Sequence, residues 1–339
     1  MKILLIQLKR IGDLILTTPA VAALRRRFPD AQITLAVSSA GEELLPAIRE
    51  INQAVVLRGS AADTPVWLRV AAANFTYCFD FTRNDRASFL TLASHARHRV
   101  TAKYVELQSK VRARFYNELV PVPMRFVHTI DSHLGLLEPL GIDEEDREIR
   151  LQLPEMDVQA SDKLLTEAGI TGEFVAVHPG SARAEKFWEP DRWATVIDHI
   201  SRNHDLPCVV TGGAAPLEKQ HIAAITSSGR APVVDLSGKT NLLGLAAVVK
   251  RARLLLTVDS APMHFAAAFH TPQVDLFGPT NPFHWRPFAE NALILQGDSG
   301  VPMTEYPLRQ RRLRMNLIST QAVIDAMETL LSASAASRL

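Results

Sequence analysis

The sequence has few cysteines, no long apolar run and almost no net charge, and each shortage excludes a class of protein. The two cysteines, Cys78 and Cys208, lie far apart in strand-like stretches, so we expect buried thiols rather than a disulfide or a metal site. No apolar run approaches the roughly 18–20 residues that a membrane-spanning helix needs. The apolar start LLIQL is too short for a signal peptide. We therefore expect a cytoplasmic protein.

Charge and length also limit the possibilities. Lys and Arg total 37 and Asp and Glu total 36, so the overall charge gives no argument for a nucleic-acid partner. A chain of 339 residues is long for one domain and comfortable for two. Short apolar runs alternate with helical patterns almost throughout, which is typical of a doubly wound α/β protein.

Apolar segments of strand length recur in both halves of the chain. We expect strands at 2–8, 32–37, 54–57, 76–81, 98–101, 174–178, 207–212, 233–236, 253–258 and 272–277. We expect helices from Thr17-Thr18-Pro19 onward and at 156–168, 190–203, 215–228, 241–251, 261–269 and 319–331. We place the domains at 1–154 and 155–318, followed at 319–339 by a helix and tail that bridge them. We expect the final residues, SASAASRL, to be frayed.

Polar, glycine-containing segments follow the expected strands of the second half. They read VHPGSARAEKFW, TGGAAPLE, DLSGKTN, TVDSAPMH and LFGPTNPFHWRPF. Ligands bind beyond the carboxyl ends of such strands, where backbone N–H groups and helix N-termini attract anions. The chain has neither GxGxxG after a strand nor GxxxxGK[ST], the fingerprints of dinucleotide sites and of P-loops. We therefore predict an anion site of nucleotide-sugar type in the second domain.

Each polar residue in these segments also has a purely structural explanation. Asp259 and Ser260 could cap the helix that follows them, and Glu218 could stabilise the dipole of its own helix. Lys186 could be a solvated loop lysine. Structural hydrogen bonding or packing is the simpler explanation for His178, His264, Trp188, Trp193 and Trp285. Several such features at one sheet edge nevertheless favour a ligand site.

Three segments resemble those of glycosyltransferase family 9, the bacterial lipopolysaccharide heptosyltransferases. They read IQLKRIGDLILTTPAVAALRRRFPDAQI, HPGSARAEKFWEPDRW and TVDSAPMHFAAAFHTPQVDLFGPTNP. The resemblance runs from about residue 1 to 331. DSAPMH, HWRPF after GPTNP and the basic stretch before LISTQAVIDAM look most like the heptosyltransferase III branch. The family resemblance implies a GT-B fold, in which two Rossmann-like domains face each other across a cleft, with the acceptor on the first and the donor on the second.

The resemblance also implies the reaction. The donor would be ADP-L-glycero-β-D-manno-heptose and the acceptor a lipid A–core oligosaccharide. Because the linkage formed in the family is α, the anomeric centre is inverted, which needs a general base on the acceptor side. Asp13 matches the family's catalytic aspartate, and we expect Gly12 to allow a tight turn that projects this carboxylate into the cleft. The alternative for Asp13 is a helix N-cap.

On the donor side, Lys186 matches the family's phosphate-binding lysine and would stabilise the charge that develops on the leaving ADP. Asp259 matches the residue that contacts heptose hydroxyls, and Glu218 matches the ribose-binding acid. Where most members of the family carry glycine after the Ser or Thr, this chain has Ala261, so we expect a slightly different loop geometry. The expected donor-binding residues are Ser181, Arg183, Lys186, Glu218, Thr240, Asn241, Leu242, Asp259, Ser260, Ala261 and His264. No DxD motif occurs, so we expect no obligatory metal or cofactor.

The acceptor side is marked mainly by positive charge. The segment from Arg83 to Arg125 holds nine Lys or Arg and three Asp or Glu, which alone could be a solvated basic face. With the resemblance, it would attract an anionic acceptor and the anionic inner leaflet. The expected acceptor-binding residues are Arg10, Gly12, Arg83, Lys103 and Arg112, with Lys110 and Arg114 as further candidates. The second basic segment, Arg309–Arg314, could also face the membrane. We expect a peripheral protein at the inner face of the inner membrane.

Other functions stay open. Heptosyltransferase I or II, a GT-B transferase with another nucleotide sugar, and an epimerase on the same scaffold would all fit the donor segments. A non-catalytic lipopolysaccharide-assembly protein is disfavoured because Asp13, Lys186 and Asp259 are all present. A dinucleotide-dependent oxidoreductase is disfavoured by the missing glycine fingerprint.

Overall fold

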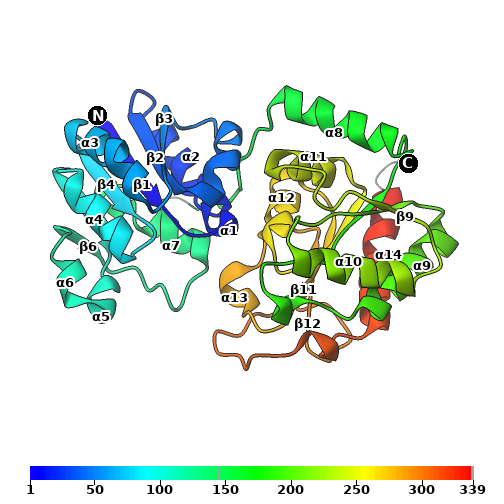
Figure 1. Cartoon of the computed structure of the whole chain (residues 1–339). Coiled ribbons are helices and arrows are strands. Elements are labelled where there is room, and N and C mark those ends of the chain that lie inside the picture. Colours follow the sequence, from blue (N-terminus) through cyan, green and yellow to red (C-terminus); the bar gives the residue numbers. More distant parts are fainter. Residues whose placement is uncertain (144, 337–339) are drawn as a thin grey trace. The chain divides into compact units, whose positions relative to one another are not determined.

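The chain divides into two compact units, each built around one parallel sheet. The computed structural model describes residues 1–143 and 145–336, and the units are Met1–Gln152 and Leu153–Leu339 (Figure 1). We expected the boundary after residue 154. Residue 144 of the acidic DEEDRE segment and the end of SASAASRL, 337–339, lie outside the described residues.

Unit 1 holds a six-stranded sheet in the order β3-β2-β1-β4-β5-β6, and all its strands are parallel. The strands are β1 (Lys2–Gln7), β2 (Gln32–Ser38), β3 (Gln53–Leu57), β4 (Tyr77–Asp80), β5 (His98–Ala102) and β6 (Glu118–Val120). The helices are α1 (Ile11–Ile15), α2 (Thr18–Arg27), α3 (Thr64–Ala72), α4 (Asp85–Ala93), α5 (Val105–Gln108), α6 (Lys110–Ala113) and α7 (Thr129–Gly135). β1 pairs with both β2 and β4, so it lies at the centre of the sheet and is buried on both faces.

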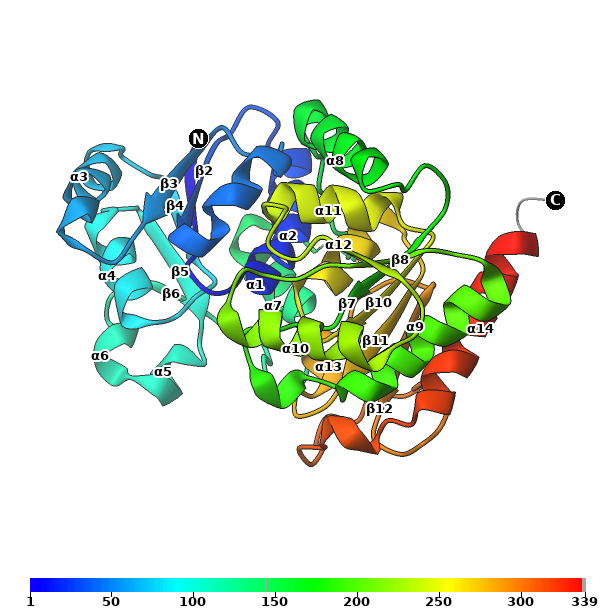
Figure 2. The same ribbon diagram turned by 45° about the vertical axis from the view of Figure 1, so that its right-hand side comes forward.

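Unit 2 repeats this plan, with strand order β12-β11-β10-β7-β8-β9. The strands are β7 (Val175–His178), β8 (Cys208–Val210), β9 (Val233–Asp235), β10 (Leu254–Val258), β11 (Gln273–Phe277) and β12 (Ala292–Gln296). The helices are α8 (Glu155–Glu167), α9 (Pro190–His204), α10 (Pro216–Ser228), α11 (Leu242–Arg251), α12 (Ala261–Phe269), α13 (Pro282–Trp285) and α14 (Thr320–Ala336). Figure 2 shows α14 beside α9, and the two helices pack against each other.

Both sheets therefore have the strand order of a Rossmann fold. Within each unit the chain first builds three strands outward in one direction and then returns to build three in the other. The reversal lies between β1 and β4 in unit 1 and between β7 and β10 in unit 2. In open parallel sheets, ligands bind at the carboxyl ends of the strands at this point. The topology therefore predicts that ligands bind at the loops after these four strands.

Most expected elements are confirmed, and the differences have simple causes. The strands β6 and β12 were not predicted, since β6 has three residues and β12 follows an irregular stretch. Helix α1 was predicted as a turn, because five residues are too few to show a helical period. Helix α14 continues through Ala336, five residues beyond the predicted end at Leu331.

Apolar packing accounts for several residues that sequence alone left ambiguous. Trp188 and Trp193 are fully buried in the core of unit 2 and meet edge to face at 5.1 Å, so their role is packing. Trp285 packs on a smaller cluster around Phe277. The thiols Cys78 and Cys208 are buried and unbridged, as expected, and burial raises the pKa of each to about 12. Among the described helices, none has the length and apolar character to cross a membrane.

Candidate functional site

In unit 1, the loops after β1 and β4 place Asp13 at the point where the strand order reverses. Asp13 is the third residue of α1, and only 7% of its surface is exposed. Its Oδ1 atom accepts no hydrogen bond from any residue that the structure describes. The nearest cation is Lys9, whose Nζ lies 3.8 Å from Oδ1. Asp13 therefore presents a buried carboxylate oxygen that is free to accept a proton.

Burial raises the pKa of Asp13 above its ordinary value, although Lys9 and Arg83 oppose that shift. The same burial, together with Arg83, lowers the pKa of Lys9. A carboxylate becomes a stronger base when its pKa rises toward the working pH. The electrostatics of this loop thus suit Asp13 to proton abstraction.

Gly12 lies inside α1 and is not among the described glycines with positive φ. The tight turn that we expected at Gly12 is therefore wrong, and a short helix positions Asp13 instead. The N-cap residue of α1 is Arg10, not Asp13, so the N-cap alternative for Asp13 is wrong as well.

Behind Asp13, three buried side chains hold the loop in place. Thr17 donates its hydroxyl hydrogen to the Asp13 carbonyl oxygen at 2.8 Å, and Gln7 Nε2 donates to Thr17 Oγ1 at 3.0 Å. His133 Nδ1 lies 3.1 Å from the Leu16 carbonyl oxygen, and burial lowers the pKa of His133 to about 3. These residues were missed from sequence, because Gln7 and His133 belong to elements far apart in the chain.

Arg83 comes from the loop after β4 and joins the same site. Its backbone is left-handed, with φ 61°, a strained conformation for a residue other than glycine. Asp80 stabilises this turn, because its Oδ1 accepts from the Thr82 N–H at 2.7 Å and from the Arg83 N–H at 2.9 Å. Tyr116 donates its hydroxyl hydrogen to the other oxygen of Asp80 at 2.5 Å. The turn therefore holds the Arg83 side chain in a buried position, close enough to influence Asp13 and Lys9.

The other expected acceptor residues divide into two groups. Arg112 donates to the Arg83 carbonyl oxygen and lies 3.3 Å from Asp85 Oδ1, so its guanidinium supports the Arg83 turn. The remaining basic candidates are exposed at the ends of short elements: Arg10, Lys103, Lys110 and Arg114.

In unit 2, the loops after β7 and β10 bring Lys186 and Asp259 together. Lys186 Nζ donates to Asp259 Oδ2 at 2.6 Å and to the Asp259 carbonyl oxygen at 3.1 Å. About 10% of the Lys186 side chain and 9% of the Asp259 side chain are exposed. Lys186 is thus not the solvated loop lysine of the simpler explanation. A buried ammonium group lies at the switch point of the second sheet.

Helix α12 begins directly after this pair. Ser260 occupies the N-cap position, but its side chain makes no capping hydrogen bond and instead donates to the Val258 carbonyl oxygen at 3.1 Å. The N-terminus of α12, beginning at Ala261, therefore keeps its partial positive charge beside Lys186. Such an arrangement favours an anion.

Two more buried groups lie near Asp259. His264 of α12 is 3% exposed, its Nδ1 has no described hydrogen-bond partner, and burial lowers its pKa to about 4. Asp275 of β11 is fully buried, and neither carboxylate oxygen has a described partner. Burial, reinforced by the negative charge of Asp259, raises the pKa of Asp275 well above its usual range. Sequence reasoning missed Asp275, although an acid within the apolar strand QVDLF is itself a signal.

Glu218 lies against the loops that follow β7 and β8. Its Oε2 accepts from the Gly213 N–H at 2.5 Å. A Cβ atom at Gly180 would lie 3.1 Å from this carboxylate, and one at Gly213 would lie 2.8 Å from it. Glycine at both positions therefore makes room for Glu218. His178, at the end of β7, has a hydrogen-bonded structural role, since its Nδ1 lies 2.9 Å from Thr211 Oγ1.

The remaining expected donor residues lie on neighbouring loops. Asn241 caps α11, because its Oδ1 accepts from the Gly244 N–H at 2.7 Å, and Thr240 and Leu242 flank it. The loop that leads to Thr240 meets the loop after β8, where the Gly238 N–H donates to the Gly212 carbonyl oxygen at 2.9 Å. The expected residues Ser181 and Arg183 are half-buried, and Arg183 pairs with Glu185.

A cavity of about 620 Å³ opens beside the loop that carries Lys186. His221 and Phe187 line it, and their rings stack with centroids 4.4 Å apart. Arg312 and Arg314, from the second basic segment, line it as well. These two arginines thus face a cavity of unit 2, which sequence alone did not indicate.

Comparison with known proteins identifies the family. Residues 65–307 match the model described as glycosyltransferase family 9 (heptosyltransferase), which is more than half of the chain. The chain belongs to glycosyltransferase family 9. It is therefore a glycosyltransferase, as the resemblance implied.

Similarity to individual proteins extends over nearly the whole chain. Lipopolysaccharide heptosyltransferase 3 of Escherichia coli is 28% identical over 95% of this chain and 97% of its own length. The crystal structure of a family 9 glycosyltransferase from Veillonella parvula superposes with a TM-score of 0.86 at 25% identity, covering 98% of this chain and 97% of that one. E. coli heptosyltransferase WaaC with ADP-2-deoxy-2-fluoro heptose has a TM-score of 0.72 at 18% identity, over 97% of this chain and 99% of that one. The predicted GT-B fold is confirmed.

Proposed function

We propose that this chain transfers L-glycero-D-manno-heptose from ADP-heptose to the inner core of lipopolysaccharide, with inversion, as a heptosyltransferase III. The relative named lipopolysaccharide heptosyltransferase 3 supports the branch, since its similarity extends along almost the full length of both chains. The donor assignment draws on the heptosyltransferase of the same fold that binds a fluorinated ADP-heptose.

One observation carries the mechanism: Asp13 is a buried carboxylate with a raised pKa and an oxygen that accepts no hydrogen bond from a described residue. In the proposed reaction, the acceptor hydroxyl oxygen attacks C1 of the heptose while Asp13 takes the hydroxyl proton. The C1–O bond to the β-phosphate breaks, and its electron pair leaves with ADP. A positioned base of this kind contributes about 10²–10⁴-fold to the rate.

The leaving diphosphate is assigned to the switch point of unit 2. Lys186 is a cation held in a buried place, and the N-terminus of α12 adds partial positive charge beside it. An ammonium group has three N–H donors, of which Asp259 takes two in this structure. Asp259 in turn would contact heptose hydroxyls, and Glu218 the ribose. We propose that this set needs no obligatory metal, so transfer should survive treatment with a chelator.

The acceptor is assigned to unit 1, where exposed cations lie on the elements that follow β5 and α5: Lys103, Lys110 and Arg114. These charges would attract phosphates and carboxylates of the core, and the anionic lipid surface that carries them. We therefore propose that the protein works as a peripheral protein at the cytoplasmic face of the inner membrane.

A mass-spectrometric transfer assay tests the proposal. Wild type, Asp13→Asn and the control Asp30→Asn are incubated with ADP-heptose and lipid A–core acceptors that carry zero, one or two heptoses. A heptose-sized mass gain only on the two-heptose acceptor, lost in Asp13→Asn and kept in Asp30→Asn, supports the proposal. Gain on a shorter acceptor moves the assignment to heptosyltransferase I or II. Failure of wild type to bind ADP-heptose would refute the assignment of ADP-heptose as the donor.

A further inference from the structure

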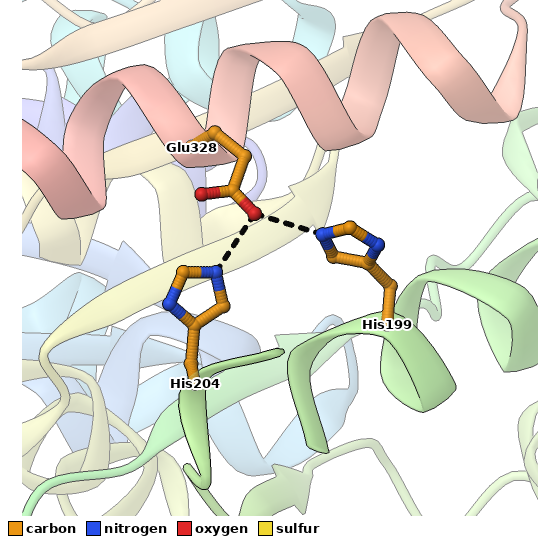
Figure 3. Close-up of side chains that lie close together, drawn as sticks. All are labelled: His199, His204 and Glu328. Carbon is orange, nitrogen blue, oxygen red and sulfur yellow. Dashed lines mark hydrogen bonds and ion pairs between the residues drawn. The ribbon is translucent and has the colours of Figure 1, made fainter. Parts of the chain in front are cut away.

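Two histidines and a glutamate converge on the outside of unit 2. Figure 3 shows His199 and His204, from the C-terminal part of α9, pointing toward Glu328 of α14. The Nε2 atoms of both rings lie 2.8 Å from the same carboxylate oxygen, Oε1 of Glu328. The three side chains are 22–37% exposed, so solvent reaches them.

The ligand atoms of these residues lie within 4.8 Å of one another, and no other group of three His, Cys, Asp or Glu among the described residues meets that criterion. Two imidazole nitrogens and one carboxylate oxygen form the ligand set of many zinc sites that keep further positions for water. An ion bound at metal–ligand distances of about 2.0–2.2 Å would lie among these three atoms.

We propose that His199, His204 and Glu328 bind one divalent transition-metal ion of the zinc class. Imidazole ligands favour Zn²⁺, Ni²⁺, Co²⁺ or Cu²⁺ over the oxygen-seeking Mg²⁺ and Ca²⁺. Binding breaks the two hydrogen bonds to Glu328 Oε1 and forms three metal–ligand bonds. A neutral ring then carries its one proton on Nδ1, and a protonated ring releases one proton to solvent.

Glu328 supplies the negative charge of the set, and both rings already point their Nε2 atoms at its Oε1. Beside the ring, Asn203 Nδ2 lies 3.1 Å from His199 Nδ1 and donates to the His199 carbonyl oxygen at 3.0 Å. With a metal on Nε2 the ring carries its proton on Nδ1, so the Asn203 amide must turn its oxygen toward Nδ1 to accept that proton. An acceptor at this position would orient the ring for a metal on Nε2.

The proposed metal site lies away from the donor site of the same unit. Helix α9 crosses back from the carboxyl end of β7 to the start of β8, so its C-terminal part lies toward the amino ends of the strands. Lys186 and Asp259 follow the carboxyl ends of β7 and β10. The ion would therefore join α14 to α9 and stabilise unit 2, without taking part in transfer.

Titration of the full chain with Zn²⁺ tests this proposal. The protein is prepared without a polyhistidine tag, stripped with a chelator and titrated by calorimetry, and thermal unfolding is followed at each zinc concentration. We expect one equivalent to bind and the Tm to rise with zinc. His199→Asn, His204→Asn and Glu328→Gln should each weaken binding by about tenfold or more. Glu167→Gln, the same change at an exposed site on α8, should leave binding unchanged.

A gain-of-binding variant makes the test independent of folding defects. Asn203→Asp supplies a carboxylate acceptor for His199 Nδ1–H and should tighten zinc binding by about tenfold. Circular dichroism checks that all metal-free variants fold. Absence of binding in wild type, or equal affinity in wild type and Glu328→Gln, would overturn the proposal. A zinc requirement for heptose transfer would contradict the purely structural role.

Discussion

Lys186 and Asp259 are 73 residues apart in sequence, yet their side chains form a buried ion pair with an Nζ–Oδ2 distance of 2.6 Å. The pair exists because β7 and β10 are adjacent in the sheet, so the loops after them meet. It lies where a Rossmann fold binds its ligand. The pair therefore contributes both to the stability of unit 2 and to the proposed donor site, and mutation can measure the first contribution by itself.

Lys186→Met should lower the free energy of unfolding by about 3–5 kcal/mol, because it leaves the Asp259 charge buried without its partner. Denaturant unfolding measures the change. The control is Lys163→Met, whose exposed pair with Glu167 at 3.7 Å should contribute less than about 1 kcal/mol. Adding Asp259→Asn to Lys186→Met should restore part of the loss, since no buried charge then remains. Strictly additive losses would contradict a coupled pair.

The pH dependence of transfer should report the raised pKa of Asp13. A base must be deprotonated to act, so kcat/KM should fall as the pH is lowered through the pKa of Asp13. Burial places this fall at a higher pH than for an ordinary aspartate, whose pKa is about 3.9. Arg83→Gln removes a nearby positive charge and should move the fall to still higher pH. A profile that does not shift in Arg83→Gln would argue against Asp13 as the base.

Asp275→Asn should stabilise the protein, and more so at higher pH. The folded state raises the pKa of Asp275 above its unfolded value of about 3.9, so folding favours the protonated form. The stability cost of Asp275 is therefore absent below that value and grows as the pH rises above it. We expect the difference in unfolding free energy between the variant and wild type to be larger at pH 8 than at pH 5. Asp298→Asn, an exposed control, should show no such growth.

Gly213→Ala should weaken donor binding if Glu218 contacts the ribose. The added Cβ would lie 2.8 Å from Glu218 Oε2, so the carboxylate must move. Losing one hydrogen bond to a charged group costs about 1.5–3 kcal/mol, which corresponds to roughly a tenfold or larger rise in KM for ADP-heptose. Gly172→Ala is the matched control, because its Cβ would meet nothing within 4 Å. A fall in kcat with an unchanged KM would place Glu218 elsewhere in the reaction.

Much of the fold could be predicted because the strands are buried on both faces. β1, β2, β7, β10 and β11 appear as short apolar runs, and their ends were predicted to within a residue or two. Short or weakly apolar elements were not predicted, since a three-residue strand such as β6 has no period to detect. The helix that carries Asp13 was missed for the same reason.

The sequence by itself determined the chemical types: an acid after the first strand, a lysine and an acid after two later strands, and a family resemblance that names their roles. Only the tertiary structure decided their environments. Burial raises the pKa of Asp13 and leaves Asp275 without a described partner. The adjacency of elements pairs Lys186 with Asp259 and brings His199 and His204 to Glu328. Burial and pairing depend on which strands and helices become neighbours. Contacts between residues more than a hundred positions apart leave no local pattern in the sequence.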